Sequence, residues 1–253
     1  MKRSERLAAI KRMTDERHQI ELTELSRLFD VSVVTIRKDA DILQERNSIR
    51  RIHGAIVSLA DEAAEKNDVY KRLTRPDKQK EKIGKIASEM ISGTGWIFIG
   101  QGSTCYHVAK ELARYDGVNV LTNNLLAAEA MTQNDRTNVV VIGGNLIHSH
   151  LYMAGEMFQR NMVDLHISCA FMGIGGIDQN AGYTVNYSSE LVVFDTVQKI
   201  SDKLILVADS GKFDKKRFLS LGGLDYADTL ITDEKPPEPY DTYYKEHGIK
   251  VLY

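Results

Sequence analysis

The chain has 253 residues, of which 43% are apolar and 27% charged, and its 33 Lys and Arg nearly balance 35 Asp and Glu. No apolar run approaches the roughly 20 residues that a membrane-spanning helix needs, and charges throughout the N-terminal residues exclude a secretory signal. We therefore expect a cytoplasmic globular protein whose two cysteines, Cys105 and Cys169, are free thiols.

Charge is distributed unevenly along the chain. Residues 1–58 contain 12 Lys and Arg but 9 Asp and Glu, whereas the remaining 195 residues contain 21 and 26. A chain of this length can hold one small and one medium domain. The balance therefore indicates that a small basic domain, and not the acidic remainder, binds a polyanion.

Two short helices are predicted first. Residues 4–16 carry Leu7 and Ile10 at helical spacing, which is typical of a helix with one buried face. The segment LTELSRLFD, residues 22–30, predicts a second helix with Thr23 as its N-cap.

A third helix follows the short DVS turn, and Ser32 is a suitable N-cap for it. Its predicted inward face consists of Ile36, Ala40 and Leu43, because these positions repeat at i, i+4 and i+7. That assignment turns Thr35, Arg37 and Lys38 outward.

A small β-ribbon is predicted over SIRRIHGAIVSL, residues 48–59, with Gly54 at its bend. Two helices with hydroxyls and cations at the start of the second suit the DNA major groove, and the ribbon would form a wing beside it. Any capped amphipathic helix also exposes charges, so this pattern alone leaves both interpretations open. The candidate DNA-binding residues are Ser32, Val33, Thr35, Arg37, Lys38, Arg50, Arg51 and His53.

The ordered set LTELSRLFDVSVVTIRKD followed by IRRIHG resembles the N-terminal winged helix-turn-helix of DeoR-family bacterial transcription regulators. This chain departs from the family pattern at Lys38, Ala40, Asn47 and Ala55. Lys38 keeps the charge of the usual arginine but loses its bidentate geometry, which favours a phosphate contact over a base contact.

Residues 59–80 are polar and charged, and we interpret them as a linker before a second domain at 81–253. That domain begins with a helix whose apolar face includes Ile83 and Ala87. Apolar strand-like runs then alternate with helical patterns, which predicts an α/β domain with a mostly parallel sheet covered on both faces. The six predicted strands are GWIFIG (95–100), NVLTN (119–123), NVVVIGG (138–144), HISCAFMG (166–173), KLILVAD (203–209) and DTLITD (228–233).

An anion site is predicted where the first of these strands ends. The turn QGST leads into a helix, whose first N–H groups and hydroxyls can hold a phosphate. Polar or glycine-rich segments, LTNN and VIGGN, follow two further strands, and ligands of open α/β sheets bind at such strand ends. A lone Gly-Ser-Thr turn can also be a simple helix cap.

These segments resemble the C-terminal effector domain of the same family, whose Rossmann-like fold is similar to ribose-5-phosphate isomerase and coenzyme A transferases. The resemblance implies a phosphorylated sugar or related metabolite as effector. Gly175 stands where the family often has an aspartate, which removes one expected sugar contact. The resemblance implies these effector-binding residues: Gly102, Ser103, Thr104, Thr122, Asn123, Gly144, Glu190, Asp209 and Lys212.

The leading hypothesis is a DNA-binding repressor of a carbohydrate-metabolism operon, released by a phosphorylated sugar and acting as a homo-oligomer, dimer or tetramer. The alternative is a sugar-phosphate isomerase-like enzyme with a DNA-binding head. Isomerisation needs a base and an acid. The isomerases that this domain resembles place acids in the turn that reads FMGIGGID here, and the matching positions carry Met172 and Gly175, which cannot transfer protons. We therefore expect no catalytic residues and no cofactor. The histidines show no metal-ligand spacing either, so no metal is expected.

Overall fold

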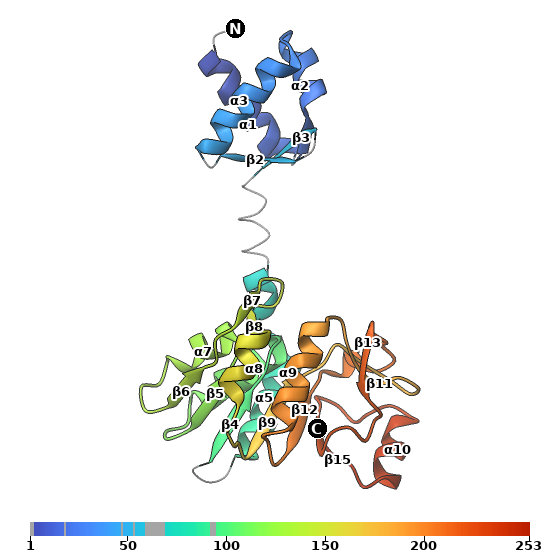
Figure 1. Ribbon diagram of the computed structural model, residues 1–253. Coiled ribbons are helices and arrows are strands. Elements are labelled where there is room, and N and C mark those ends of the chain that lie inside the picture. The colour runs from blue at the N-terminus through green and yellow to red at the C-terminus, as the bar shows by residue number, and fades with distance from the viewer. Residues whose placement is uncertain (1–2, 18, 47, 53, 59–68, 92–94) are drawn as a thin grey trace. The chain divides into compact units, whose positions relative to one another are not determined.

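The computed structural model describes residues 3–17, 19–46, 48–52, 54–58, 69–91 and 95–253. The chain forms two compact units, Met1–Tyr70 and Lys71–Tyr253, which we call the head and the body (Figure 1). Among the helices of these described ranges, none combines the length and the apolar composition required to cross a membrane.

The head contains three helices and a three-stranded antiparallel sheet of order β1-β3-β2. The three helices and the ribbon confirm the sequence prediction, whereas β1 was not predicted. Because β1 runs directly into α2, the helix starts after Glu21 and the prediction that Thr23 caps it is wrong. The elements are α1 Arg3–Arg17, β1 Gln19–Glu21, α2 Leu22–Phe29, α3 Val33–Glu45, β2 Ile49–Ile52 and β3 Ala55–Ser58.

The turn between α2 and α3 is tight because Asp30 adopts a left-handed conformation, with φ 48°. The Val31 amide donates to the Ser26 carbonyl at 3.2 Å, and the Ser26 hydroxyl donates to the Val31 carbonyl at 2.6 Å. Ser32 then caps α3 by accepting the Thr35 amide at 3.2 Å, as predicted. This geometry orients the second helix of the helix-turn-helix.

The head core is formed by apolar side chains from all three helices and the sheet. Ile36, Ala40 and Leu43 are buried along α3, so the predicted inward face is confirmed. The same face also buries Asp39, whose carboxylate accepts from Arg6 Nε at 2.6 Å. This ion pair ties α1 to α3, and the sequence analysis did not foresee it.

A seven-stranded sheet of order β15-β14-β12-β9-β4-β5-β6 forms the centre of the body. All its neighbouring strands are parallel. Each of the six predicted strands belongs to this sheet, and the three-residue strand β15 was not predicted. The strands are β4 Trp96–Ile99, β5 Asn119–Thr122, β6 Asn138–Val141, β9 Cys169–Gly173, β12 Leu204–Val207, β14 Thr229–Ile231 and β15 Lys250–Leu252.

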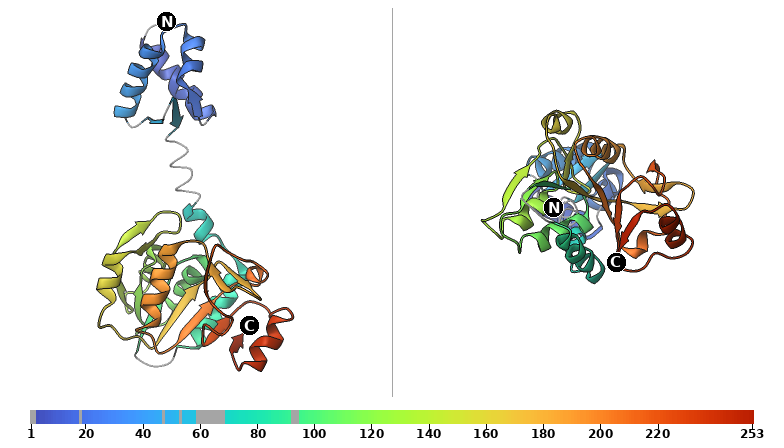
Figure 2. Two further views of the ribbon diagram at one scale, coloured as in Figure 1. Left: turned by 45° about the vertical axis from the view of Figure 1, so that its right-hand side comes forward. Right: turned by 90° about the horizontal axis from the view of Figure 1, so that it is seen from below.

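Helices cover both faces of this sheet, as the continuous apolar strands require. On one face Ile97 and Ile99 share a core with residues of α5, α6 and α7. Helices α8 and α9 cover the other face (Figure 2). There the Phe98 ring lies 6.4 Å from the Phe158 ring of α8, and α9 adds Phe194. The helices are α5 Lys78–Glu89, α6 Ser103–Leu112, α7 Leu125–Met131, α8 Glu156–Met162 and α9 Ser188–Gln198.

Smaller elements surround the sheet. They are the hairpin β7 Asn145–Ile147 and β8 Tyr152–Ala154, the sheet of β10 Gly176–Asp178, β11 Gly182–Val185 and β13 Leu219–Gly222, the 3-10 turn Ser210–Lys212, and α10 Tyr240–Glu246.

The predicted linker, 59–80, differs from the structure at its C-terminal end. Residues 59–68 lie outside the described residues, but residues 71–80 belong to the body. Leu73 is buried there, and Asp77 caps α5 by accepting the amides of Gln79 and Lys80. The body therefore starts before residue 81. The polar composition of residues 71–80 made them resemble a linker in the sequence.

Strand order fixes the place of a ligand site. From β4 the chain adds β5 and β6 on one side, whereas β9, β12, β14 and β15 follow on the other. The order therefore reverses between β4 and β9. In open α/β sheets, ligands bind beyond the carboxyl ends of the strands at such a switch point.

Candidate functional site

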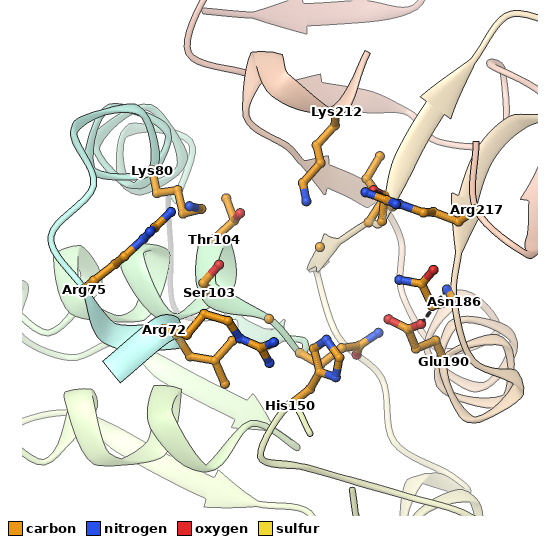
Figure 3. A pocket seen from close by; sticks show the side chains of 16 residues that line it. Arg72, Arg75, Lys80, Ser103, Thr104, His150, Asn186, Glu190, Lys212 and Arg217 are labelled. Carbon is orange, nitrogen blue, oxygen red and sulfur yellow. Dashed lines mark hydrogen bonds between the residues drawn. The ribbon is translucent and has the colours of Figure 1, made fainter. Parts of the chain in front are cut away.

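The turn after β4 has the geometry of an anion cradle. Gly102 has φ 98°, which only glycine adopts readily, and it precedes α6 without a side-chain cap. The first N–H groups of α6 therefore have no partner within the helix. The hydroxyls of Ser103 and Thr104 make no hydrogen bond to any described residue and face the same cavity (Figure 3). Predicted residues Gly102, Ser103 and Thr104 thus lie together, as expected.

The polar residues after β5 support this turn from behind instead of lining the cavity. Thr122 is fully buried and its hydroxyl donates to the Ile99 carbonyl at 2.6 Å. Asn124, the last residue of the polar segment LTNN, donates to the carbonyls of Gly100 and Gly102 at 3.1 and 3.3 Å. These bonds fix the shape of the turn after β4, Gly102–Thr104.

Three further predicted effector residues are placed away from the cavity. Asn123 donates to the Met153 carbonyl at 2.8 Å and joins β5 to β8. Gly144 packs against Phe158, where a Cβ would lie 3.1 Å from the Phe158 Cβ. Asp209 precedes the 3-10 turn and is absent from the cavity lining. Along with Thr122, these residues are absent from the lining, although the Asp209 carboxylate acts electrostatically on Lys212, which belongs to it.

The cavity lies at the switch point and has a volume of about 230 Å³. Its walls come from the turn after β4, the turn after β9 and the start of the body chain (Figure 3). Its polar and charged side chains are Arg72, Arg75, Lys80, Gln101, Ser103, Thr104, His150, Asn186, Glu190, Lys212 and Arg217.

Cations outnumber acids in this lining. Five Lys and Arg side chains face one carboxylate, that of Glu190. Glu190 Oε2 accepts the amides of Asn186 and Tyr187, both at 3.0 Å, while burial raises its pKa. Burial also lowers the pKa of Lys212 and of His150. A cavity with this excess of positive charge attracts anions.

The segment before α5 supplies cations that the sequence analysis missed. Arg72 donates to the Ser149 carbonyl at 2.7 Å, and Lys80 pairs with Asp77. Arg75 makes no side-chain hydrogen bond to any described residue. The segment RLTRPDKQK, residues 72–80, could have indicated this, because its closely spaced cations Arg72, Arg75 and Lys80 line the cavity on the side of Ser103 and Thr104.

Gly175 and Arg217 share one corner of the cavity. Arg217 Nε donates to the Gly175 carbonyl at 2.9 Å, and a Cβ on Gly175 would lie 2.9 Å from Arg217 Cγ. Arg217, from the segment before β13, therefore occupies the space that a side chain at position 175 would need. No sequence pattern indicated that these two residues meet.

In the head, the exposed side of α3 carries free polar groups. Arg37 and Lys38 are exposed and make no hydrogen bond or ion pair with the described residues. Thr35 lies beside them, with its hydroxyl 2.9 Å from that of Ser32. Val33 is a correction: it packs against the head core, because it lies three residues before Ile36 on the inward face.

The wing differs in part from the prediction. Arg51 pairs with Asp41 of α3, and its amide donates to Gln44 at 3.0 Å, so its guanidinium braces the wing against α3. The side chain of Arg50 and the whole of His53 lie outside the described residues. Val34, which is 59% exposed, is an apolar surface residue that the sequence analysis passed over.

No group of three potential metal ligands occurs among the described His, Cys, Asp and Glu residues. Cys105 is a buried free thiol whose pKa burial raises to about 12, and Cys169 is also free. Neither cysteine is among the described residues that line the cavity.

Comparison with known proteins assigns both units. Residues 6–62 match the DeoR-like helix-turn-helix domain, and residues 76–234 match the DeoR C terminal sensor domain. The glycerol-3-phosphate regulon repressor of Haemophilus influenzae is 31% identical over 253 residues, covering 100% of this chain and 97% of that protein.

A second relative and a solved structure share less sequence identity with this chain. The transcriptional repressor GlcR of Bacillus subtilis is 26% identical over 253 residues, covering 100% of this chain and 96% of that protein. Among solved structures, ribose 5 phosphate isomerase A from Neisseria gonorrhoeae has 17% identity and a TM-score of 0.40, covering 55% of this chain and 54% of that one.

Proposed function

The chain belongs to the DeoR family of transcriptional regulators, and from this premise we propose that it represses a carbohydrate-metabolism operon and leaves its operator when a phosphorylated sugar binds the body. Two of its relatives are named as repressors, one of them of a glycerol-3-phosphate regulon. As a DNA-binding regulator it would act in the cytoplasm.

One observation supports the effector proposal above all. The N–H groups at the start of α6, two unpartnered hydroxyls and Arg75 converge on one cavity at the switch point of the sheet. Backbone N–H groups at a helix start together with a guanidinium are the usual donors to a phosphate. The uncharged polar side chains of the lining, such as Gln101 and Asn186, would hold the hydroxyls of a sugar.

The effector proposal is tested by a ligand screen. The full chain is mixed with sugar phosphates and the free sugars, and thermal unfolding is followed. A bound ligand at 100 times its dissociation constant stabilises the body by about 2.7 kcal/mol. Ser103→Ala and Arg75→Gln should remove that stabilisation, while Arg114→Gln, exposed and outside the cavity, should keep it. If phosphates never stabilise the body more than free sugars do, the proposal is wrong.

We propose that Ser32, Thr35, Arg37 and Lys38 contact the operator. Arg37 on the exposed face can reach a guanine edge, and Lys38 a phosphate. Arg37→Ala should weaken operator binding by about 1–3 kcal/mol and relax sequence preference. Arg51→Ala should act mainly through the position of the wing, because its guanidinium is already paired with Asp41. Operator selection followed by gel-shift titration separates the two results.

A single head reads one half-site, so tight binding calls for two heads. We propose a homo-oligomer, a dimer or tetramer, assembled through the body. The edge strand β6 exposes Val140 and Val141, at 42% and 45%, which are apolar residues suited to such a contact. Sedimentation at micromolar concentration tests this: a monomer that binds an isolated half-site tightly would contradict it.

We also propose that the body binds its ligand without turnover. Glu190 is the single acid among the described lining residues, and an isomerase needs a second group to complete proton transfer. Asp178 does not replace it, because its carboxylate accepts the amides of Asn180 and Ala181 outside the cavity. Product formation from any ligand found in the screen would support the enzyme alternative instead.

A further inference from the structure

The cavity carries cations in two places. A phosphate bound at the turn Gly102–Thr104 would explain one of these groups of cations, but not the other. Arg72, Arg75 and Lys80 lie on the side of Ser103 and Thr104, whereas Lys212 and Arg217 lie across the cavity (Figure 3). The second group comes from the segment between β12 and β13, and therefore from a different part of the chain.

Lys212 lacks a fixed partner. Its ammonium makes no hydrogen bond, and no ion pair within 4.0 Å, with the described residues, although it lines the same cavity as Glu190. Loss of hydration lowers the pKa of Lys212 most, the nearby Asp209 carboxylate raises it, and repulsion by Arg217 lowers it. Lys212 is half-buried and Arg217 is exposed, and an anion bound between the two would relieve their mutual repulsion.

Arg217 is held in place by hydrogen bonds from its backbone amide and its Nε. Its backbone amide donates to Thr184 Oγ1 at 3.0 Å and its Nε to the Gly175 carbonyl at 2.9 Å. Within the described part of the chain, its two Nη groups make no further hydrogen bond. A guanidinium anchored in this way can present a pair of N–H groups to a carboxylate or phosphate without further loss of side-chain entropy.

The cavity also contains uncharged polar groups that suit hydroxyls. Gln101 is 2% exposed, lines the cavity, and neither its Oε1 nor its Nε2 has a hydrogen-bond partner among the described atoms. A buried amide needs polar partners, and the hydroxyls of a sugar could supply them here. Asn186 and the second oxygen of Glu190 add further acceptors and donors nearby (Figure 3).

We propose that the effector carries a second anionic group, a carboxylate or a second phosphate, which Lys212 and Arg217 bind while its first phosphate occupies the turn at Gly102. The inference rests on the proposed effector function and narrows the ligand class to doubly anionic phosphorylated metabolites. Charge balance with Glu190 and Asp209 does not explain the two cations, because among the described residues neither carboxylate forms an ion pair within 4.0 Å with Lys212 or Arg217.

Inorganic phosphate tests this without knowledge of the natural ligand. Crystals of the full chain are soaked at a phosphate concentration that saturates the turn, and the ions in the cavity are located. Two ions, one at Ser103 and Thr104 and one between Lys212 and Arg217, support the proposal. An ion at the turn alone contradicts it and leaves the proposed function intact. An empty turn contradicts both.

Matched ligands then identify the second group. Glucose 6-phosphate is compared with 6-phosphogluconate, which adds a carboxylate, and fructose 6-phosphate with fructose 1,6-bisphosphate, by calorimetric titration of the full chain. The doubly anionic member of a pair should bind about 10-fold more tightly or better, the worth of one charge-assisted hydrogen bond. Whichever pair shows the larger ratio tells whether carboxylate or phosphate is preferred.

Arg217→Gln should remove this preference and change the affinity for the monophosphate by less than about 3-fold, since the turn is untouched. Lys216→Gln is the matched control, because Lys216 is exposed, adjacent in sequence and outside the cavity lining. Equal affinity for both members of each pair in the wild-type protein, or equal weakening of both by Arg217→Gln, would overturn the proposal.

Discussion

Replacing Asp39 with asparagine should destabilise the head far more than its conservative size suggests. The carboxylate is fully buried and holds Arg6, whose side chain is 10% exposed, at 2.6 Å. It also holds Arg3 at 2.9 Å, but that side chain is 55% exposed, so this second pair contributes at most about 1 kcal/mol. Leaving Arg6 buried without its partner costs about 3–5 kcal/mol.

That loss is comparable to the whole stability of so small a unit, about 3–9 kcal/mol for some 58 residues. Operator binding should therefore fall because the head unfolds, and not because a DNA contact is lost. The double variant Arg6→Met with Asp39→Leu should recover much of the stability, since an apolar pair removes both buried charges.

Amide hydrogen exchange of α1 and α3 in the full chain measures this stability directly. The body provides an internal control, because the single tryptophan, Trp96, lies in β4 and its fluorescence should not change. Arg3→Gln should alter exchange only slightly. The reasoning is refuted if Asp39→Asn leaves the exchange of α3 within about 0.5 kcal/mol of the wild type, the scatter of ordinary surface substitutions.

Three further outcomes are expected. In Gly102→Ala the added Cβ would lie more than 4 Å from any atom beyond its chain neighbours, but alanine would have to adopt φ 98°. The turn should therefore be strained by about 1–3 kcal/mol. Phosphate binding measured by calorimetry should be weaker. Asn124→Ala should lower body stability by about 1–3 kcal/mol in urea unfolding, because the buried carbonyls it serves lose their donor. Burial lowers the pKa of His107 and His150 below 6.5, so the unfolded chain takes up protons first. The free energy of unfolding of the body should therefore be highest above about pH 6.5 and should fall as the pH drops toward the folded-state pKa values. Urea unfolding at about pH 7.5 and at about pH 5.5 measures this difference. His107→Gln should make the difference smaller.

Periodicity and capping were sufficient to predict the helix-turn-helix and six parallel strands, because these elements are decided by local pattern. Ser32 and the face of Ile36 show this in the head. Elements of three residues, such as β1 and β15, carry too little pattern to be predicted. The start of the body was misplaced because residues 71–80 gain their structure from tertiary contacts and not from composition.

The site was predictable where a motif is continuous in sequence, as at Gly102 and Ser103. It was not predictable where distant segments meet, as where Arg217 fills the corner beside Gly175. Nor does a strand-end position tell whether a side chain faces the ligand or, like Thr122, turns back to hold the neighbouring strand.

The coupling between the two units is the central claim, and one titration tests it most directly. The dissociation constant of the full chain for its selected operator is measured by fluorescence anisotropy, with and without a saturating phosphorylated ligand, for the wild type and for Ser103→Ala. We predict that the ligand weakens wild-type binding about 5- to 150-fold and leaves the variant's binding unchanged. An operator affinity of the wild type that is the same with the body saturated and empty would contradict the account.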